Sequence, residues 1–438
     1  MTTREGRASS GLPRARSGLR ALLRLAGDPL ERPAEYFDEL GDTFEVRLFG
    51  STHVLTRDPV WFEEVLVKKS KSFQKDRATK GLGALLGQGL LVRDGAAWRE
   101  RRRLLGPPFT PTEIERHLAT FRAEATRELD RWRPDEAVDI HQSMARLTMR
   151  IALVTLFGYE ASERDEFEVH MAAAMRYFEG IGGTQVPLPT WVPTRVNRDF
   201  ALARLRFREF LERIIARAAP PGSVLDVLEG ARRDGRLSHD DVVDEAMTML
   251  VAGHETSALS LTYLLAELGL QPELQEPIVR AASSWADPLS LRDLTQGSAV
   301  HRAVLEGLRL YPVTWALGRE ALEPVDIEGC RVEAGTQVYL FQWSMQRSPR
   351  FFDRALELWP DRFIEQPLGA LSKGRFVPFG MGPRICIGNQ FALAEIAVIL
   401  TDVLRRFRVE TKSRFPPRFR ASITARPREP VLVSVRPR

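Results

Sequence analysis

One uninterrupted stretch with helical periodicity, from His239 to Leu270, constrains the fold of this sequence more than any other feature. It is about thirty residues long, whereas helices in globular proteins average about 11–12 residues. A helix of this length crosses a whole domain at about 1.5 Å per residue, so the rest of the chain has to pack around it. Its longest uncharged part, Thr256–Ala266, reaches only about half the length of a membrane span. The stretch therefore predicts the central helix of a globular domain and no membrane span.

Helical periodicity also dominates the rest of the chain. The other predicted helices are Asp58–Lys69, Gly95–Leu105, Pro111–Trp132, Met144–Phe157, Glu163–Phe178, Arg198–Ala218, Leu274–Ala286, Gln296–Leu310 and Asn389–Phe407. Two regions have β character, a hairpin over Phe44–Thr56 and the segment Val325–Leu340. Because they are far apart in the sequence, they have to meet across the helices. We expect a single domain over residues 31–438, mainly α with a small β part, after a basic and partly disordered tail over residues 1–30.

Composition narrows the class of protein. The 438 residues include 63 Lys and Arg and 58 Asp and Glu, and the net charge of +5 is too mild to imply a nucleic-acid partner. The two cysteines, Cys330 and Cys386, exclude a disulfide framework and a cysteine-rich zinc site. The seven histidines show no metal-ligand spacing. We therefore expect a cytoplasmic protein with reduced thiols.

The sharpest motif surrounds one of these cysteines, in the order Phe379, Gly382, Arg384, Cys386 and Gly388. Glycines let a backbone approach a flat ligand closely. A helix is predicted directly after the loop, and a helix N-terminus lowers the pKa of a cysteine. The thiolate could ligate a metal or, with a histidine partner, act as a nucleophile. The alternative is a small buried cysteine in a turn.

The motif resembles the haem-binding loop of the cytochrome P450 superfamily of haem-thiolate monooxygenases. The resemblance implies the cytochrome P450 fold, with haem b (iron protoporphyrin IX) between the long helix and the helix after the cysteine loop. It implies that Cys386 is the metal ligand and binds iron on its proximal side. Phe379 and the backbone N–H groups around Gly388 are then expected beside the thiolate.

Three further residues resemble the charge network of this family. Glu306 and Arg309 lie three residues apart on a predicted helix, so that they can form an ion pair. Arg362 follows in the segment that starts at Pro360. Taken alone, the pair could be a surface salt bridge. The resemblance implies a buried structural network that braces the haem loop.

The middle of the long helix carries the sequence Ala252, Gly253, His254, Glu255 and Thr256. Small residues let another group approach, and the threonine hydroxyl can bond back to the carbonyl four residues earlier. The alternative is a helix packed through small residues, with its glutamate on the wet side. The resemblance implies that the glutamate and threonine are catalytic and deliver protons for O2 activation, and that the alanine contacts the haem.

The two carboxylates of a haem need cationic partners. Trp98 and Arg102 share a face of one predicted helix and resemble the pair that binds a haem propionate in this family. The resemblance adds Arg319 and Arg384 as further propionate ligands. The neighbouring cations are Arg99, Arg101 and Arg103. They are expected to face outwards, as a solvated basic face or as a docking patch for an acidic electron donor.

The chain carries no flavin or iron–sulfur segment, so the resemblance implies electrons from a separate ferredoxin or flavodoxin with its reductase. The expected substrate is a hydrophobic small molecule, such as a fatty acid, a terpenoid or another natural product. Its pocket is predicted at Met249, Gly253, Val313, Trp315 and Leu317. Three alternatives stay open: a peroxide-driven enzyme, a non-oxygenating enzyme of the same fold, and a haem-binding sensor.

Overall fold

The structure is a computed structural model that describes residues 11–15, 28–48, 50–160, 164–179, 188–283, 285, 289–295, 297–371 and 373–438. The α-helices are α2 (Arg32–Leu40), α3 (Pro59–Glu63), α4 (Arg77–Gly81), α5 (Gly83–Leu86), α6 (Gly95–Leu104), α7 (Pro111–Leu129), α8 (Ile140–Phe157), α9 (Arg164–Phe178), α10 (Arg195–Ile215), α11 (Val224–Arg233), α12 (His239–Leu270), α13 (Gln275–Ser283), α14 (Leu291–Thr295), α15 (Ala299–Leu310), α16 (Gln342–Gln346), α17 (Arg362–Glu365) and α18 (Asn389–Arg406). The strands are β1 (Thr43–Leu48), β2 (Ser51–Thr56), β3 (Phe73–Lys75), β4 (Ala137–Asp139), β5 (Leu317–Ala321), β6 (Val325–Ile327), β7 (Cys330–Val332), β8 (Gln337–Leu340), β9 (Phe407–Thr411), β10 (Phe419–Ala421), β11 (Ala425–Pro427) and β12 (Leu432–Pro437).

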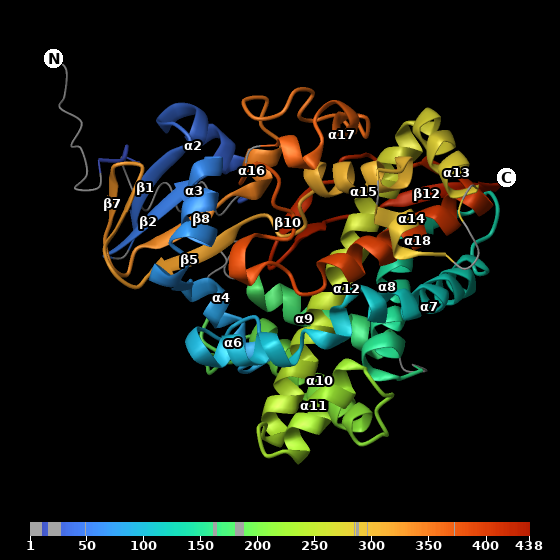
Figure 1. Cartoon of the computed structure of the whole chain (residues 1–438), viewed down its shortest axis with the longest axis horizontal. Helices are drawn as coiled ribbons and strands as arrows, with labels where there is room; N and C mark the ends of the chain where they lie inside the picture. Colours follow the sequence, from blue (N-terminus) through green and yellow to red (C-terminus); the bar gives the residue numbers. More distant parts are fainter. Residues whose placement is uncertain are drawn as a thin grey trace.

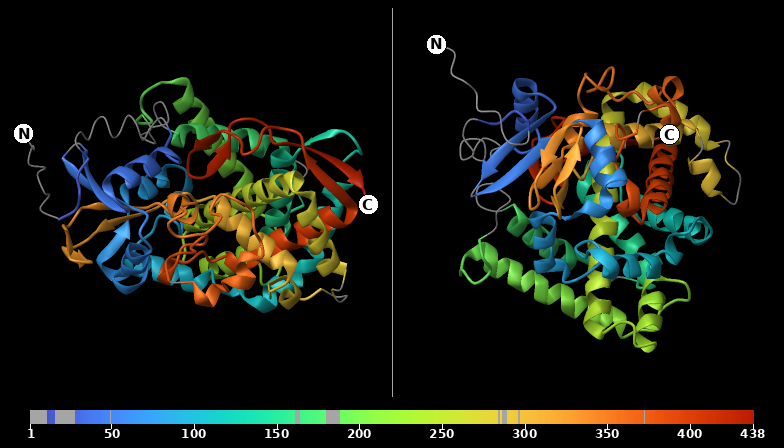
Figure 2. Two further views of the ribbon diagram at one scale, coloured as in Figure 1. Left: turned by 90° about the horizontal axis from the view of Figure 1, so that it is seen from above. Right: turned by 60° about the vertical axis from the view of Figure 1, so that its left-hand side comes forward.

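Helix α12 is the predicted central helix, and it begins and ends at the predicted residues. Its N-terminus is a capping box, because the Ser238 hydroxyl accepts the Asp241 N–H at 3.1 Å and the Asp241 carboxylate accepts the Ser238 N–H at 3.1 Å. In Figure 2 this yellow-green helix runs through the middle of the molecule, with α8 and α18 among the helices packed on it. Of its 32 residues, 24 are buried, so it organises the core.

The two predicted β regions meet through β8 in one sheet of order β1-β2-β8-β5-β3, at the left of Figure 1, whereas β6 and β7 of the second region pair with each other in a separate sheet. The predicted hairpin is antiparallel, with Thr43 opposite Thr56. Its second strand pairs in parallel with β8. Strands β3 and β5 were not predicted, and they add Lys75 opposite Arg319 at the edge of the sheet.

The helical part agrees with the predicted periodicity, and its differences have local causes. Helix α8 starts four residues early because the Asp139 side chain caps it. Helix α15 starts three residues late because the Ser298 hydroxyl accepts the His301 N–H at 3.1 Å. Helix α11 was not predicted, and it too starts at a serine cap, Ser223.

The start of the chain contributes one described segment to the sheet. Residues 11–15 lie alongside β1, where Glu45 donates its N–H to the Pro13 carbonyl at 2.8 Å and accepts the Ala15 N–H at 3.0 Å. The Arg14 guanidinium pairs with the Glu45 carboxylate at 2.5 Å. For residues 1–10 and 16–27 of the predicted tail, the prediction of partial disorder falls outside the described ranges.

The hairpin of β10 and β11 reaches from the end of the chain into the helical core. The Ala425 carbonyl accepts the Tyr263 hydroxyl of α12, and the Ala425 N–H donates to the Val313 carbonyl at 2.9 Å. The Trp315 ring N–H donates to the Ser422 carbonyl at 3.0 Å. The hairpin thus connects the central helix to the segment that enters β5.

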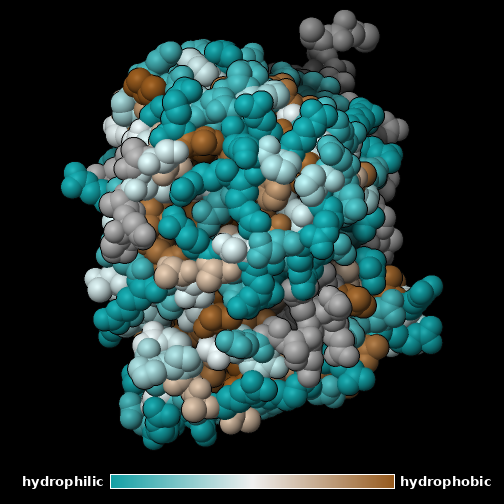
Figure 3. Space-filling model, turned by 90° about the vertical axis from the view of Figure 1, so that its right-hand side faces the viewer, coloured by the Kyte–Doolittle hydropathy of each residue, from teal (hydrophilic) through white to brown (hydrophobic). Residues whose placement is uncertain are grey.

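In the described part of the chain no helix is long and apolar enough to span a bilayer. The face of the molecule in Figure 3 is mainly hydrophilic, with hydrophobic residues in small separate groups.

Candidate active site

The cysteine loop is held in a compact shape by its own backbone. The Val377 carbonyl accepts the Gly380 N–H, and the Phe379 carbonyl accepts the Cys386 N–H, both at 2.9 Å. Gly382 has φ +70°, and a Cβ there would collide with the Leu66 carbonyl, so only glycine is accommodated. The loop therefore delivers the cysteine sulfur to a fixed place just before α18.

Part of the Cys386 side chain is accessible to solvent, but protein atoms pack closely enough around the sulfur to remove much of its hydration. Burial raises the pKa of its thiol, while the Gly388 N–H and the charge of Arg102 act to lower it. The prediction of a lowered pKa at the helix N-terminus is therefore wrong for the free thiol, because desolvation outweighs the backbone donor. Metal coordination would deprotonate the thiol in any case. Among the described residues, no group of three or more His, Cys, Asp or Glu side chains offers an alternative metal site.

The three residues of the predicted charge network are brought together, fully buried, between α15 and α17. Glu306 accepts two hydrogen bonds from Arg309, at 2.8 and 2.9 Å, and a forked contact from the Arg362 Nε at 3.2 Å. The Trp359 N–H donates to the same carboxylate at 3.2 Å. The interpretation as a surface salt bridge is wrong, because both guanidiniums and the carboxylate are almost completely shielded from solvent.

Backbone carbonyls bind the remaining guanidinium protons of this network. Arg309 donates to the carbonyls of Gln346 and Ala355 at 2.6 and 2.7 Å. Arg362 donates to the carbonyls of Asp353 and Arg354. The two guanidiniums are therefore stabilised by one carboxylate and by carbonyl dipoles from the segment that precedes the cysteine loop.

A second cluster, of cations, lies beside the cysteine loop. Burial, followed by repulsion from Arg319 and Arg384, lowers the pKa of Lys75 to about 7. Burial and repulsion from Arg384 lower the pKa of Arg319 to about 10. Asp76 and Asp94 are the acidic groups that oppose these shifts. The three cations outnumber these two carboxylates, so the cluster has an excess of positive charge. Like charges opposite one another on paired strands are unfavourable, and a ligand with two carboxylates would relieve this repulsion.

Of the predicted propionate ligands, Arg319 and Arg384 belong to this cluster, and Trp98 and Arg102 lie beside it. The Arg384 guanidinium lies 4.3 Å from the centre of the Trp98 ring, pairs with Asp94, and donates to the Arg93 carbonyl at 3.0 Å. The partly buried Arg102 is close enough to interact electrostatically with Cys386. The residues present thus fit a flat dicarboxylate cofactor next to a cysteine. Lys75 was missed, because no sequence motif marks it.

The centre of α12 differs from the rest of that helix. Ala252 is exposed, and Gly253 and Thr256 are half-buried, although their neighbours along the helix are buried. The Thr256 hydroxyl donates to the Ala252 carbonyl at 2.9 Å, which confirms the predicted back-bond. A Cβ on Gly253 would touch only Leu156, at 3.8 Å, so the glycine leaves the helix surface low without being forced by a clash.

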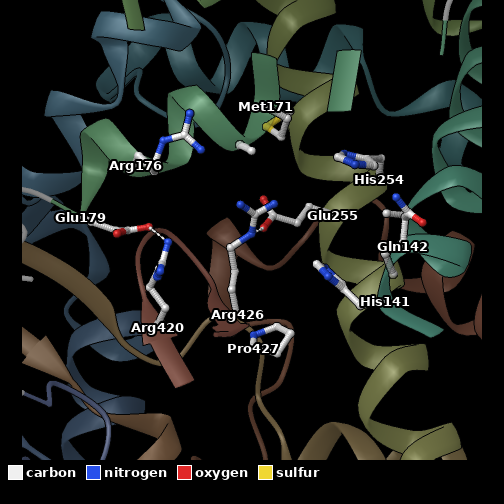
Figure 4. A pocket seen from close by; sticks show the side chains of 13 residues that line it. His141, Gln142, Met171, Arg176, Glu179, His254, Glu255, Arg420, Arg426 and Pro427 are labelled. Carbon is white, nitrogen blue, oxygen red and sulfur yellow. Dashed lines mark hydrogen bonds and ion pairs between the residues drawn. The ribbon is translucent and has the colours of Figure 1, made fainter. Parts of the chain in front are cut away.

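Glu255 is buried and lines a pocket of about 230 Å³ (Figure 4). In the figure its carboxylate and the Arg426 guanidinium point toward one another, and the two form an ion pair. The Thr424 hydroxyl also donates to Glu255, at 2.9 Å. The alternative interpretation, in which Glu255 lies on the solvent-facing side of the helix, is therefore wrong. The lining residues are His141, Gln142, Ala145, Met171, Ala172, Arg176, Glu179, His254, Glu255, Ala258, Arg420, Arg426 and Pro427.

Two histidines face this pocket without positive charge. Burial and the charge of Arg426 lower the pKa of His141 to about 3. The same causes, with repulsion from His141, lower the pKa of His254 to about 3. Farther along the pocket, Glu179 and Arg420 are paired at 3.4 Å. The pocket is thus polar, with Glu255 at its inner wall.

The predicted substrate residues come from two elements. Met249 is buried on α12, one turn before the exposed Ala252, and Gly253 follows it on the same helix. The other three belong to the segment that enters β5. Val313 is buried and Trp315 is half-buried against Phe341. The Leu317 side chain lies 3.7 Å from the position that a Cβ on Gly380 of the cysteine loop would take.

One predicted surface residue is not at the surface. Arg99 and Arg103 are exposed, but Arg101 is buried and pairs with Asp241 at 2.7 Å and with Glu245 at 3.4 Å. The prediction that Arg101 faces outwards is wrong, because its acidic partners lie in the first turns of α12, far away in the sequence.

A glycine-rich cysteine loop, a buried charge network and a group of cations beside the loop fit the site of a haem-thiolate protein, and comparison with known proteins identifies the family. The profile of the family described as cytochrome P450 matches residues 16–435. The chain therefore belongs to the cytochrome P450 family and is a cytochrome P450 monooxygenase. The family implies a haem-thiolate cofactor, a hydrophobic substrate and a redox partner.

Two related oxygenases and one solved structure are similar to this chain over most of its length. Cyclooctat-9-en-7-ol 5-monooxygenase of Streptomyces melanosporofaciens is 29% identical, over 86% of this chain and 85% of the relative. Pentalenene oxygenase of Streptomyces avermitilis is 26% identical, over 87% of each chain. The crystal structure of CYP175A1 from Thermus thermophilus is similar with a TM-score of 0.80 and 28% identity, and covers 97% of this chain and 100% of that one. The cytochrome P450 fold is thus shared along nearly the whole length.

Proposed function

We propose that this cytochrome P450 binds haem b through Cys386 and inserts one oxygen atom of O2 into a hydrophobic small molecule, with a terpenoid favoured over a fatty acid. When bound, the haem supplies the reduction of O2 and the oxidation of the substrate. The observation that carries the proposal is Cys386 in its glycine-rich loop beside a cluster of cations, in which Arg319 is buried and Lys75 and Arg384 are half-buried. The terpenoid preference is supported by the names of the two oxygenases similar to this chain.

The cations beside the loop would hold the two haem carboxylates. Arg102, Arg319 and Arg384 are proposed as propionate ligands, together with the Trp98 ring N–H. We add Lys75, because its register opposite Arg319 is favourable only with an anion between or beside the two side chains. The flat ring would then lie against Ala252 and the glycines of the cysteine loop.

Glu255 and Thr256 would move protons toward the place where O2 is reduced. The Thr256 hydroxyl donates its hydrogen bond to the Ala252 carbonyl, so it can donate to another group only after turning. While it keeps this bond, its oxygen can still accept a hydrogen bond from water. Glu255 faces the polar pocket of Figure 4, from which water can supply its proton. The ion pair with Arg426 and the hydroxyl of Thr424 would hold the carboxylate at the inner wall of this pocket.

The electrons are proposed to come from a ferredoxin or flavodoxin with its reductase. The exposed Arg99 and Arg103 support a docking face for such acidic proteins, whereas Arg101 is taken up by the ion pairs with α12. A single domain over residues 31–438 and a cytoplasmic location stay predictions, the latter from the free Cys330 and Cys386.

The test is a substrate screen with two sources of activated oxygen, either O2 with a ferredoxin and a reductase or hydrogen peroxide. Haem-loaded protein is titrated with terpenoid and fatty-acid libraries, and ligands that shift the spin state are incubated with a ferredoxin, a reductase and O2. We expect a product with one added oxygen atom, labelled when ¹⁸O2 is used. Product formed only with hydrogen peroxide would support the peroxide-driven alternative. Spin-state ligands without turnover under either supply would support a haem-binding sensor or a non-oxygenating enzyme.

A further inference from the structure

Gln346, at the end of α16, connects three parts of the site that are far apart in the sequence. Its side chain is completely buried. The side-chain amide donates to the carbonyls of Leu308 and Arg309, at 3.3 and 3.1 Å, in the last turn of α15. Its Oε1 accepts the Val377 N–H at 2.9 Å, and its backbone carbonyl accepts the Arg309 guanidinium at 2.6 Å. One residue therefore joins the charge network to the start of the cysteine loop.

The contact with Val377 is the first of a short series of hydrogen bonds that leads to the cysteine. The Val377 carbonyl accepts the Gly380 N–H and closes the turn that carries Phe379. The Phe379 carbonyl in turn accepts the Cys386 N–H. A displacement of Val377 would therefore move the turn and, through it, the backbone that carries the cysteine sulfur.

The orientation and the type of this side chain are both determined by its partners. Val377 can only donate through its N–H, and Leu308 and Arg309 can only accept through their carbonyls, so a flipped amide would lose all three bonds. Carbonyls in the last turn of a helix lack partners within the helix, and Gln346 donates to two of them. A neutral histidine offers one donor and one acceptor and cannot make the same three contacts.

We infer that Gln346 is a positioning residue that couples the Glu306–Arg309–Arg362 network to the cysteine loop and so sets the position of the Cys386 sulfur. This inference rests on the proposed role of Cys386 as iron ligand. It predicts that removal of the Gln346 amide harms the thiolate ligation itself, and not only the stability of the fold.

The chain offers a matched control one helical turn earlier. Gln342 lies on the same short helix, is also fully buried, and donates its side-chain amide to the Thr314 carbonyl. Within the described part of the chain, this amide makes no hydrogen bond to the cysteine loop. Substitution of Gln342 by methionine should therefore cost fold stability without acting on the loop, whereas Gln346→Met should do both.

The experiment compares wild type, Q346M and Q342M as haem-loaded proteins. The reduced protein is exposed to CO, and the decay of the strongly red-shifted Soret band to the unshifted band is followed at equal distance below each variant's unfolding temperature. We expect Q346M to decay about tenfold faster than wild type, as for one buried N–H left without an acceptor, and Q342M to stay within about twofold. Equal decay rates for the two variants would overturn the inference.

Hydrogen exchange gives a second readout that does not depend on activity. The Val377 amide should exchange about tenfold faster in Q346M than in wild type or Q342M. If Q346M does not retain haem, Q346L takes its place, since leucine is a smaller apolar side chain and likewise offers no acceptor to the Val377 N–H. A Val377 amide protected equally in all variants would contradict the coupling. A wild type without the red-shifted band would instead refute the role of Cys386, so the two failures are distinguishable.

Discussion

Replacing Glu306 by glutamine should destabilise this protein more than replacing Arg362 by methionine, although both changes remove the same ion pair. The reason is the composition of the buried network, which holds two guanidiniums and one carboxylate. Burial lowers the pKa of Arg362, and the charge of Glu306 opposes this shift, so the carboxylate is what makes the second cation tolerable. Glu306→Gln therefore leaves two buried cations without an anion, whereas Arg362→Met leaves a neutral ion pair.

The magnitudes follow from what remains in each case. Glu306→Gln leaves Arg309 and Arg362 buried without a carboxylate, for which we expect a loss of about 3–5 kcal/mol. Arg362→Met leaves the two-point pair of Glu306 and Arg309 intact and strands the carbonyls of Asp353 and Arg354 without that donor. Unmade hydrogen bonds of this kind cost about 1–3 kcal/mol.

The assay is urea unfolding of the haem-loaded proteins, followed by the Soret band and by far-UV circular dichroism. The double variant completes a mutant cycle, in which the second substitution should cost less in the presence of the first, because removal of one guanidinium relieves the charge left by E306Q. An equal loss for both single variants, or a larger loss for R362M, would refute the argument from charge balance.

Three further predictions concern the site. Arg426→Gln should raise the amount of peroxide released per product several-fold and leave the CO spectrum unchanged, because Glu255 loses the cation that holds its carboxylate. Arg420→Gln is the control, since Arg420 pairs with Glu179 in the same pocket, and it should leave this ratio near the wild-type value. Thr256→Val keeps the shape of the side chain without its hydroxyl, so peroxide should again replace product while the spin-state shift on substrate binding is retained. The pKa of Lys75 falls from 10.5 to about 7 through burial and its neighbouring arginines, so the penalty of its buried charge is fully present below pH 7 and fades as the pH rises toward 10.5. Lys75→Met should therefore stabilise the haem-free protein by about 2 kcal/mol at pH 7 but little at pH 10, and speed haem loss; faster haem loss without the pH-dependent gain would contradict this account.

Local signals explain what could be predicted from the sequence. Ser238 and Asp241 mark the start of the central helix, and the periodicity continues without a break, so both ends were predicted correctly. The cysteine loop and the Glu306–Arg309 pair are short motifs whose residues lie close in the chain. The contact between Glu306 and Arg309 follows from their spacing on a helix, whereas the role of the cysteine loop and the inclusion of Arg362 came from the resemblance to the family.

What could not be predicted depends on partners from distant segments. Arg101 was predicted to be exposed because no residue near it in the sequence indicates its contacts with the acidic residues of α12. Arg426 sits in a C-terminal hairpin without a motif, yet it pairs with Glu255. Lys75 becomes notable only through its register opposite Arg319. The pKa of Cys386 was predicted with the wrong sign because burial is a property of the packed fold.

The central claim is that Cys386 binds the haem iron as a thiolate. The most direct measurement is the absorption spectrum of the reduced protein with CO, for wild type and for Cys386→His. We expect the strongly red-shifted Soret band for wild type, which thiolate-ligated ferrous haem gives, and its loss in the variant with haem still bound. The same red-shifted band in both proteins, or no haem band in wild type after haem supplementation, would contradict the account.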